Sequence, residues 1–409
     1  MSLPYYAEFG WEPTILCIEP NFIEGIYDPT LSMTVPESIE VIKSPAISQK
    51  LSRKFALGNL AFRSIFFLIK ETAKYFEKNS FDVVYFSTTV FLTMTLGRYW
   101  FAKYKVPYVL DFQDPWLRDD YARTTTAPPG GKLKYAIVQS LAQVLEPFTL
   151  RQASHITSVS PEYPKILMQR YAWLKADRFT ILPFGAPERD FEILPNLNIQ
   201  QKIFDPKDGY QHWVYVGRGG DDMAFSLNSL FLAIQKLRQQ SPELWRTIKI
   251  HFVGTKYSIF DRDKPIEAIA ASYDLNGLVA EYPQRIPYFE ALQILKDSHA
   301  ILIIGSDEPS YSPSKVYPCV LARKPLLAIL HRQSLVVDVL ERCKAGQTVT
   351  FDDRTVDLLE SLIAKLEWLR SQAQSYIPNT DWEAFQPYTA REMTKKQCAI
   401  FDRCISPSL

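Results

Sequence analysis

The stretch GSDEPSYSPSKVYPCVLARKPLLAIL, from Gly305 to Leu330, decides the fold of this chain. An apolar run stops at Gly305, a turn rich in serine and proline follows, and Ser314 and Lys315 begin a short helical segment. A second apolar run comes after it. A strand, a polar turn, a helix and a strand form half of a parallel nucleotide-binding sheet, whose ligands lie at the carboxyl ends of its strands. We therefore expect an anionic ligand at this turn.

Length and composition fit a two-domain globular protein. The chain has 409 residues, of which 47% are hydrophobic and 22% charged, both ordinary for a globular protein. The formal net charge of +1 gives no argument for nucleic acid as a partner. The five cysteines are scattered without a CxxC pair, which favours a reducing, cytoplasmic setting over a disulfide framework or a zinc site. No apolar run approaches the ~20 residues that span a bilayer.

Apolar runs alternate with segments of helical period along the whole chain. The candidate strands are 14–18, 39–42, 83–87, 108–111, 155–159, 179–182, 213–216, 249–253, 279–282, 300–304, 326–330 and 348–351. The longer helical candidates are 56–76, 91–104, 133–152, 226–239, 288–296, 356–372 and 382–403. Strands that alternate with helices of this length indicate right-handed crossovers and parallel sheets. The pattern predicts an α/β protein with two Rossmann-like domains, each with a parallel sheet, that face each other across a cleft.

The domain boundaries follow from the same runs. We expect a first domain over 1–187, a linker without sustained period over 188–210, a second domain over 211–380 and a final helical segment over 381–409. The chain opens with the end of a helix followed by a strand, so the strand that normally precedes this helix is missing. In a doubly wound sheet that first strand lies near the centre. Its absence would leave strand edges unpaired. We therefore expect the natural protein to start upstream of Met1; a rearranged sheet is the alternative.

Several segments carry a family resemblance. They are VPYVLDFQDPW (106–116), FTLRQASHITSVSPEY (148–163), FTILPFGAPERDFE (179–192), VYVGR (214–218), SPSKVYPCVLARKPLLAI (312–329) and the tail WEAFQPYTAREMTKKQCAIFD (382–402). In order and spacing they resemble the GT-B glycosyltransferases, specifically the retaining family-four enzymes that use nucleotide-sugar donors. The resemblance covers nearly the whole chain.

The resemblance implies a division of labour. The donor is bound mainly by the second domain, the acceptor is held by the first, and the last helix crosses back to the first domain. The sugar, a hexose, is transferred with retention of configuration and without an essential metal or other cofactor. The chemistry then depends chiefly on stabilising the departing nucleoside diphosphate, which positioned cations and helix N-termini supply.

A glycine-rich turn is the first candidate for binding the donor. Gly217, Arg218, Gly219 and Gly220 follow a predicted strand and precede a helix. Glycines let the backbone approach a phosphate, and an arginine can donate two hydrogen bonds to the phosphate oxygens. A plain turn with a solvated arginine is the alternative, but the position and the resemblance favour the site.

Four further positions are donor candidates. Lys315 stands at the start of a helix, where the ammonium and the positive end of the helix dipole would both attract a diphosphate. Ser312 and Ser314 either bind phosphate or only cap that helix. Lys256 follows another strand end and could face the nucleotide, although lysines in loops are usually solvated.

The chain departs from the family at two positions. Many relatives carry two glutamates eight positions apart, one beside the transferred sugar and one on the ribose hydroxyls. Alignment on the resembling segment places them at Ser310 and Pro318, neither of which is acidic. Asp307 and Glu308 are nearby carboxylates that could replace the first glutamate, unless they are simple turn residues.

The first domain offers acceptor-side candidates at a strand end. Asp111 and Asp114 flank the end of the strand at 108–111, where one carboxylate could orient an acceptor hydroxyl or act as a base. Alternatively, Asp114 caps the next segment or pairs with Arg118. Trp116 could stack on a sugar ring, although an indole is more often a packing residue.

Two more features bear on function. None of the five histidines belongs to a ligand-spaced cluster, and core or strand-end positions are expected for them. Residues 50–78 form a basic amphipathic segment, which could lie on an anionic membrane and would suit a lipid-linked acceptor. A helix packed on the sheet with a solvated basic face is the alternative.

The sequence as a whole predicts a glycosyltransferase. It would move a sugar from a nucleotide sugar to a glycan or lipid-linked acceptor, in polysaccharide biosynthesis, in the cytoplasm or peripherally at the inner face of the membrane. One alternative is a nucleotide-sugar epimerase of the same architecture, which needs acid–base carboxylates and a histidine in its cleft. The other is a catalytically inactive, glycosyltransferase-like binding module, which the residues at Ser310 and Pro318 favour.

Overall fold

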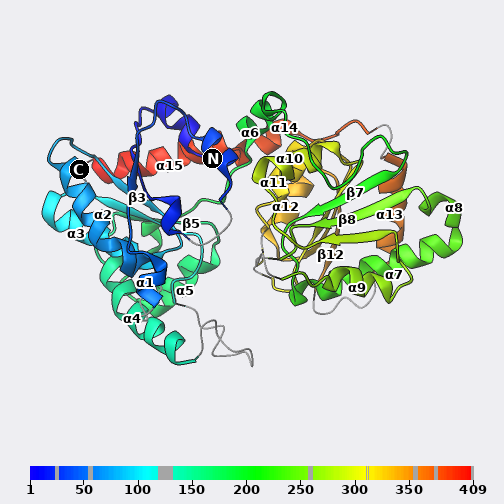
Figure 1. The fold of residues 1–409 in the computed structure, drawn as a ribbon, viewed down its shortest axis with the longest axis horizontal. Helices are drawn as coiled ribbons and strands as arrows, with labels where there is room; N and C mark the ends of the chain where they lie inside the picture. Colours follow the sequence, from blue (N-terminus) through cyan, green and yellow to red (C-terminus); the bar gives the residue numbers. More distant parts are fainter. Residues whose placement is uncertain are drawn as a thin grey trace. The chain divides into compact units, whose positions relative to one another are not determined.

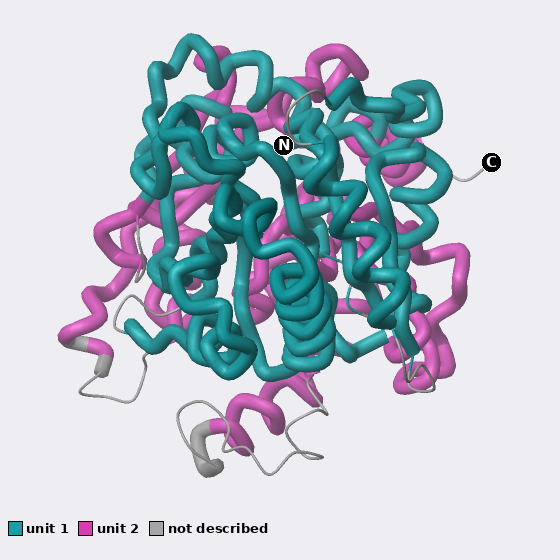
Figure 2. Tube along the Cα trace, turned by 90° about the vertical axis from the view of Figure 1, so that its right-hand side faces the viewer, with its two compact units in different colours: residues 1, 28–34, 185–392 teal, residues 2–27, 35–184, 393–409 magenta. Residues whose placement is uncertain are grey.

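The chain folds into two compact α/β units, seen here in a computed structural model (Figures 1 and 2). The structure describes residues 1–23, 27–53, 59–117, 132–256, 261–309, 311, 313–352, 358–372 and 376–406. Unit 1 consists of residues 1, 28–34 and 185–392. Unit 2 consists of residues 2–27, 35–184 and 393–409. The last helix of the chain therefore returns to the unit that contains the N-terminal half.

Unit 1 is built on one six-stranded parallel sheet, in the order β12-β11-β10-β7-β8-β9. Its strands are β7 (Gln211–Val216), β8 (Ile248–Val253), β9 (Val279–Tyr282), β10 (Ala300–Ile304), β11 (Leu326–His331) and β12 (Gln347–Phe351). Its helices are α6 (Glu188–Ile193), α7 (Ala224–Gln240), α8 (Pro242–Trp245), α9 (Pro265–Ala271), α10 (Tyr288–Asp297), α11 (Val316–Leu321), α12 (Leu335–Arg342), α13 (Leu359–Gln372) and α14 (Trp382–Phe385). All six strands predicted for the second half of the chain are present.

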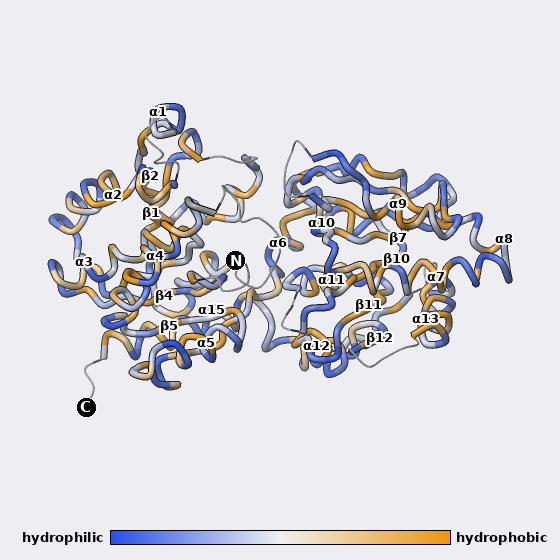
Figure 3. The backbone as a smooth tube through the Cα atoms, turned by 90° about the horizontal axis from the view of Figure 1, so that it is seen from below, coloured by the Kyte–Doolittle hydropathy of each residue, from blue (hydrophilic) through white to orange (hydrophobic). Residues whose placement is uncertain are grey.

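Helices cover both faces of the unit 1 sheet. Leu302 and Ile304 of β10 pack in a core with residues of α7, α9 and α13, whereas Ile301 and Ile303 pack in a second core with residues of α10, α11 and α12. A strand covered on both sides reads as a continuous apolar run, and β10 and β11 accordingly appear in orange in Figure 3. Burial of these apolar side chains holds the strands in place and thereby positions the loops at the carboxyl edge of the sheet.

Unit 2 contains two separate parallel sheets. The strands are β1 (Ile15–Ile18), β2 (Val41–Ser44), β3 (Val84–Ser87), β4 (Tyr108–Phe112), β5 (His155–Ser158) and β6 (Phe179–Ile181). The helices are α1 (Gln49–Arg53), α2 (Leu60–Phe76), α3 (Thr95–Tyr104), α4 (Lys132–Leu150), α5 (Glu162–Arg170) and α15 (Ala390–Ile405). The strands β1 and β2 pair only with each other, and the second sheet has the order β3-β4-β5-β6. In the described residues, the outer edges of β1 and β3 carry no partner strand.

The strand β4 is the centre of the unit 2 core. Leu110 and Phe112 belong to a cluster that the helices α3 and α4 complete, and Val109 lies on the opposite face with Ile400 and Phe401 of α15. This alternation places the last helix of the chain on the second face of the sheet. The core therefore joins residues from both ends of the sequence.

Three predicted segments differ from the observed structure. The tail predicted as one helix is broken into α14, a short 3-10 turn and α15, because Pro387 cannot donate a helical hydrogen bond. Residues 188–210 begin with the helix α6, although they lack a long period. The basic face predicted for residues 50–78 does not include Arg63, which is buried and donates hydrogen bonds to the carbonyls of Ile47 (2.9 Å) and Phe22 (3.0 Å). Residues 54–58 of that segment lie outside the described residues.

No helix in the described ranges is both long enough and apolar enough to cross a membrane.

Candidate functional site

The carboxyl edge of the unit 1 sheet contains the candidate site. From β7 the chain continues to β8 and β9 on one side, then returns to β10, β11 and β12 on the other. The order of the strands thus reverses between β7 and β10, and ligands of such sheets bind at the carboxyl ends of the strands at this point. The loop after β7 carries residues 217–220, and the turn after β10 leads to Lys315. Lys315 reaches Tyr215 of β7, which is 100 positions earlier in the sequence, so the two segments meet here.

Gly217 brings the loop after β7 into contact with Lys315. A Cβ at Gly217 would lie 2.8 Å from Lys315 Nζ and 3.0 Å from its Cδ, and the φ angle of Gly217 is +150°. Both the close approach and the backbone angle favour glycine. The backbone N–H of Gly217 donates to the Val253 carbonyl (2.9 Å), and that of Gly219 donates to the Thr255 carbonyl (2.7 Å). The loop is therefore held by the next strand of the sheet.

The ammonium of Lys315 packs against Tyr215 of β7. Its Nζ lies 3.9 Å from the ring centroid and donates to the phenolic oxygen. Burial lowers the pKa of Lys315 to about 7; the nearby Cys319 and Asp222 raise it and Arg218 lowers it. Lys315 immediately precedes α11, as the sequence predicted. Because its ammonium is costly to bury, an anion beside it would favour the protonated form.

Arg218 is held by an ion pair within its own loop. Its Nη1 and Nη2 donate to Asp222 Oδ1 (2.9 Å) and Oδ2 (2.6 Å), and its guanidinium lies 4.7 Å from the ring centroid of Tyr311. This two-point contact lowers the pKa of the Asp222 carboxyl. Tyr215 donates to the Arg218 backbone carbonyl (2.6 Å) and accepts from Lys315, which joins the backbone of the loop to the lysine. Sequence reasoning missed Asp222; its spacing of four residues from Arg218 was the available signal.

The other donor candidates occupy different surroundings. Lys256 forms an ion pair with Asp261 (3.1 Å) in the loop after β8. The neighbouring Thr255 donates to Glu281, whose buried carboxylate also accepts from the first N–H groups of α9. Ser314 is exposed and does not cap α11, so the capping role predicted for it is not observed. Ser312 lies outside the described residues.

The two predicted carboxylates of the turn after β10 are exposed. The N–H of Asp307 donates to the Asp222 carbonyl (2.8 Å), and that of Glu308 donates to the Ser306 hydroxyl (3.0 Å). The first of these bonds ties the turn after β10 to the loop after β7, and the second lies within the turn. Pro318 lies within α11, and Ser310 lies outside the described residues.

The acceptor-side candidates of unit 2 lie in contrasting environments. Asp111 is buried at the end of β4 and accepts from Thr157 (2.8 Å) and Gln113 (2.7 Å). Burial raises the pKa of Asp111, although these hydrogen bonds oppose the rise. Asp114 is exposed, so the two carboxylates do not share one environment. Trp116 is buried and stacks on Phe91 (5.6 Å between centroids), which makes it a packing residue. Arg118 lies outside the described residues.

Comparison with solved structures identifies the architecture. A glycosyltransferase from Rickettsia africae matches with a TM-score of 0.58 at 15% identity, over 100% of this chain and 94% of that one. HepE of Anabaena, solved with UDP and glucose, matches with a TM-score of 0.58 at 14% identity, over 98% and 94%. The N-terminal domain of trehalose-6-phosphate phosphatase from Candida albicans matches with a TM-score of 0.55 at 12% identity, over 98% and 92%.

The fold is GT-B. The match extends over both units of the chain, so the GT-B architecture predicted from the order of strands and motifs is confirmed. No protein-family model matches the sequence, and no curated protein matches it. At this level of identity, the likeness establishes the fold and leaves activity to be argued from the site.

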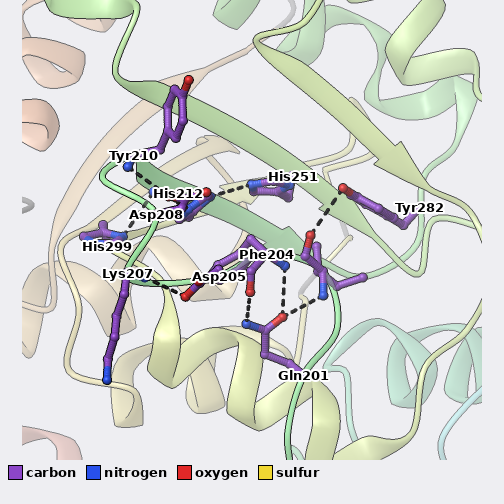
Figure 4. Close-up of polar contacts among 11 residues, drawn as sticks. Gln201, Phe204, Asp205, Lys207, Asp208, Tyr210, His212, His251, Tyr282 and His299 are labelled. Atoms are coloured by element: carbon purple, nitrogen blue, oxygen red, sulfur yellow. Dashed lines mark hydrogen bonds and ion pairs between the residues drawn. The ribbon is translucent and has the colours of Figure 1, made fainter.

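Unit 1 of this GT-B protein also contains a histidine cluster, which the sequence did not predict (Figure 4). His212 Nδ1 lies 2.9 Å from His251 Nε2, His212 Nε2 lies 2.9 Å from Asp208 Oδ1, and the N–H of His212 donates to His299 Nδ1 (3.1 Å). Phe204 stacks on His212 at 4.3 Å. Because His212 and His299 lie near the amino ends of β7 and β10, the cluster is at the opposite edge of the sheet from Lys315.

The described residues contain no group of three or more His, Cys, Asp or Glu side chains arranged to hold a metal ion.

Proposed function

We propose that this protein is a glycosyltransferase that binds a nucleotide sugar at the carboxyl edge of the unit 1 sheet. The observation that carries the proposal is the convergence of Arg218 and Lys315 on the glycine-rich loop at the point where the strand order reverses. Two cations there can stabilise a departing nucleoside diphosphate, the role that transfer chemistry requires. Related folds solved with UDP and with UDP-glucose make uridine diphosphate the first nucleotide to test.

The finer parts of the proposal follow from the family resemblance. We propose a hexosyl transfer of the family-four type, with retention of configuration, to a glycan or lipid-linked acceptor in polysaccharide biosynthesis. Asp307 and Glu308 would lie beside the sugar, and Asp111 would position groups on the acceptor side. No metal is required, because Arg218 and Lys315 supply the positive charge. The free thiols of all five cysteines fit a location in the cytoplasm, with peripheral membrane contact.

Nucleotide titration tests the donor site directly. We expect calorimetry to detect binding of one of UDP, GDP and ADP, and Arg218→Ala and Lys315→Ala each to weaken it by about 1–3 kcal/mol, the scale of a charged hydrogen bond. Lys256→Ala is the matched control: Lys256 pairs with Asp261 in the loop after β8 and, unlike Arg218, is not among the groups that act on the charge of Lys315. If Arg218→Ala and Lys315→Ala both bind like the parent, the site is misplaced. Transfer that persists in the presence of a chelator would support the metal-free mechanism.

One observation favours a second function, an inactive binding module. Pro318 stands in α11 where many relatives have a ribose-binding glutamate, and a proline offers no side-chain acceptor. Tight nucleotide binding without release of sugar from any nucleotide sugar, in the presence of glycan and lipid acceptors, would support this function over the transferase.

A further inference from the structure

The helix α4 exposes an apolar face. Ile137 is 61% exposed, Val144 is 66% exposed and Phe148 is 44% exposed. Positions separated by seven and by four residues lie on the same side of a helix, so these side chains form one stripe. The opposite side of α4 is buried, with Ala142 and Leu150 in the unit 2 core. A surface helix ordinarily places polar residues on its outer side.

The stripe also lacks charge. From Tyr135 to Leu150, the only charged side chain is Glu146, which is buried and paired with Arg170 (2.9 Å). An exposed apolar patch bordered by polar residues marks a surface for a partner or a membrane.

One cation contacts this stripe, and two more pair with aromatic rings on α3 and at the end of α4. Arg98 of α3 lies 4.0 Å from the ring centroid of Phe148 and donates to its carbonyl (2.7 Å). At the end of α4, Arg151 lies 5.2 Å from the ring of Trp173, which is 37% exposed. On α3, Lys103 is exposed and lies 5.8 Å from the ring of Tyr99.

A shallow hollow lies at the same end of α4. It has a volume of about 420 Å³ and is lined by Phe101, Arg151, Gln152, Ala153, Ser154 and Arg178. None of these residues is acidic. Arg178 Nε is buried and has no hydrogen-bond partner among the described residues. Two arginine side chains without a carboxylate among the lining residues fit an anionic oxygen, such as that of a phosphate.

We propose that the α3–α4 surface of unit 2 docks on a bilayer that contains anionic lipid. This surface consists of Tyr99, Lys103, Ile137, Val144, Phe148, Arg151 and Trp173, with the hollow beside Arg178. Aliphatic side chains enter the boundary between headgroups and acyl chains, tyrosine and tryptophan occupy the interface, and the cations meet headgroup phosphates. The complementarity of charge selects the occupant, since the rim is cationic and the stripe is uncharged. This assignment rests on the peripheral membrane contact of the proposed function and names its surface; vesicle binding tests it separately from sugar transfer.

Vesicle sedimentation of the full chain tests this docking. We expect the protein to pellet with vesicles of phosphatidylcholine mixed with phosphatidylglycerol, and much less with phosphatidylcholine alone. Val144→Asp should lower the partition coefficient about tenfold, because a carboxylate would enter the anionic interface. Arg151→Gln should lower the partition coefficient about fivefold, because one cation near an anionic surface contributes about that factor to binding. Rising salt should weaken the parent's binding.

Leu244→Asp is the matched control, since Leu244 is 47% exposed on α8 of unit 1 and should leave the partition unchanged. Thermal melts and nucleotide binding of Val144→Asp establish that the variant is folded, independently of lipid. Failure of the parent to pellet would overturn the proposal, as would equal pelleting of parent and Val144→Asp. A shift of the parent from dimer to monomer on Val144→Asp, measured by light scattering, would assign the surface to a second copy of the chain instead.

Discussion

Protonation of Lys315 should control the affinity for a nucleoside diphosphate. The pKa of Lys315 is lowered to about 7, so at pH 7 about half of the molecules carry the ammonium and at pH 9 about one in a hundred do. An anion beside the side chain favours the charged form and raises this pKa in the complex. If only the protonated form binds well, the apparent affinity falls with the protonated fraction, about 50-fold from pH 7 to pH 9.

The direction of this effect is fixed by the ammonium. The contribution of Lys315 to affinity is full well below pH 7 and is lost as the pH rises through 7, since the free protein must then take up a proton to bind. The diphosphate itself is almost fully ionised above pH 7, so it contributes little to the change. At pH 7, binding should take up about half a proton per nucleotide, as expected for a group titrating at its pKa.

Calorimetry at several pH values measures both quantities. Affinities should be determined from pH 7 to pH 9, each in two buffers of different ionisation enthalpy, so that proton uptake is obtained with the affinity. Lys315→Met should bind weakly with no such pH dependence, whereas Lys256→Met should keep the parent's. An affinity for the parent that is constant from pH 7 to pH 9 would refute the reasoning, as would a Lys315→Met variant that retains the pH dependence.

Three predictions concern stability. Glu281→Ala should lower the free energy of unfolding by about 3 kcal/mol, because donors of three residues at the buried carboxylate lose their acceptor. Urea denaturation measures this free energy, and a loss below ~1 kcal/mol would contradict the prediction. Gly185→Ala should lower the free energy of unfolding by about 2 kcal/mol, since the new Cβ would lie 2.5 Å from the backbone of Ala390. A melting temperature equal to the parent's would contradict this prediction. Burial lowers the pKa of His251 from 6.5 to about 4, so its contribution is complete above pH 6.5 and is lost as the pH falls toward 4. The parent should therefore lose about 2 kcal/mol more than His251→Phe between pH 7 and pH 5, and equal losses in the two proteins would exclude His251 as the cause.

The strands were predictable because burial on both faces makes each one a continuous apolar run. The run at 300–304 is β10 with unchanged boundaries, and the run at 326–330 is β11 one residue longer. The same logic predicted that the loop after β7 and the turn before α11 each follow the carboxyl end of a strand, and parallel strands end at one edge of a sheet. Lys315 and Gly217 were thus both identified from their positions at strand ends.

Contacts between polar side chains were less predictable. Asp222 looks like an ordinary helix-start residue in the sequence, and only the turn of the loop brings it onto Arg218. The histidines at 212, 251 and 299 are far apart in the sequence, and the register of β7 with β8 brings the first two together. Trp116 was assigned to a sugar as one alternative, but its burial against Phe91 depends on a helical segment earlier in the chain. Such contacts follow from tertiary packing, which no local pattern encodes.

The charge balance of the resting site explains why its two cations behave differently. Asp222 neutralises Arg218 through two hydrogen bonds, whereas Lys315 has a tyrosine hydroxyl and a buried thiol as neighbours and lowers its own charge by releasing a proton. The protein alone therefore avoids an unpaired buried cation, which would be costly. A diphosphate changes both conditions: it can share Arg218 with Asp222, and it makes the charged form of Lys315 favourable. The charge of Lys315, about half of its full value at pH 7 in the protein alone, would then become complete when a diphosphate binds.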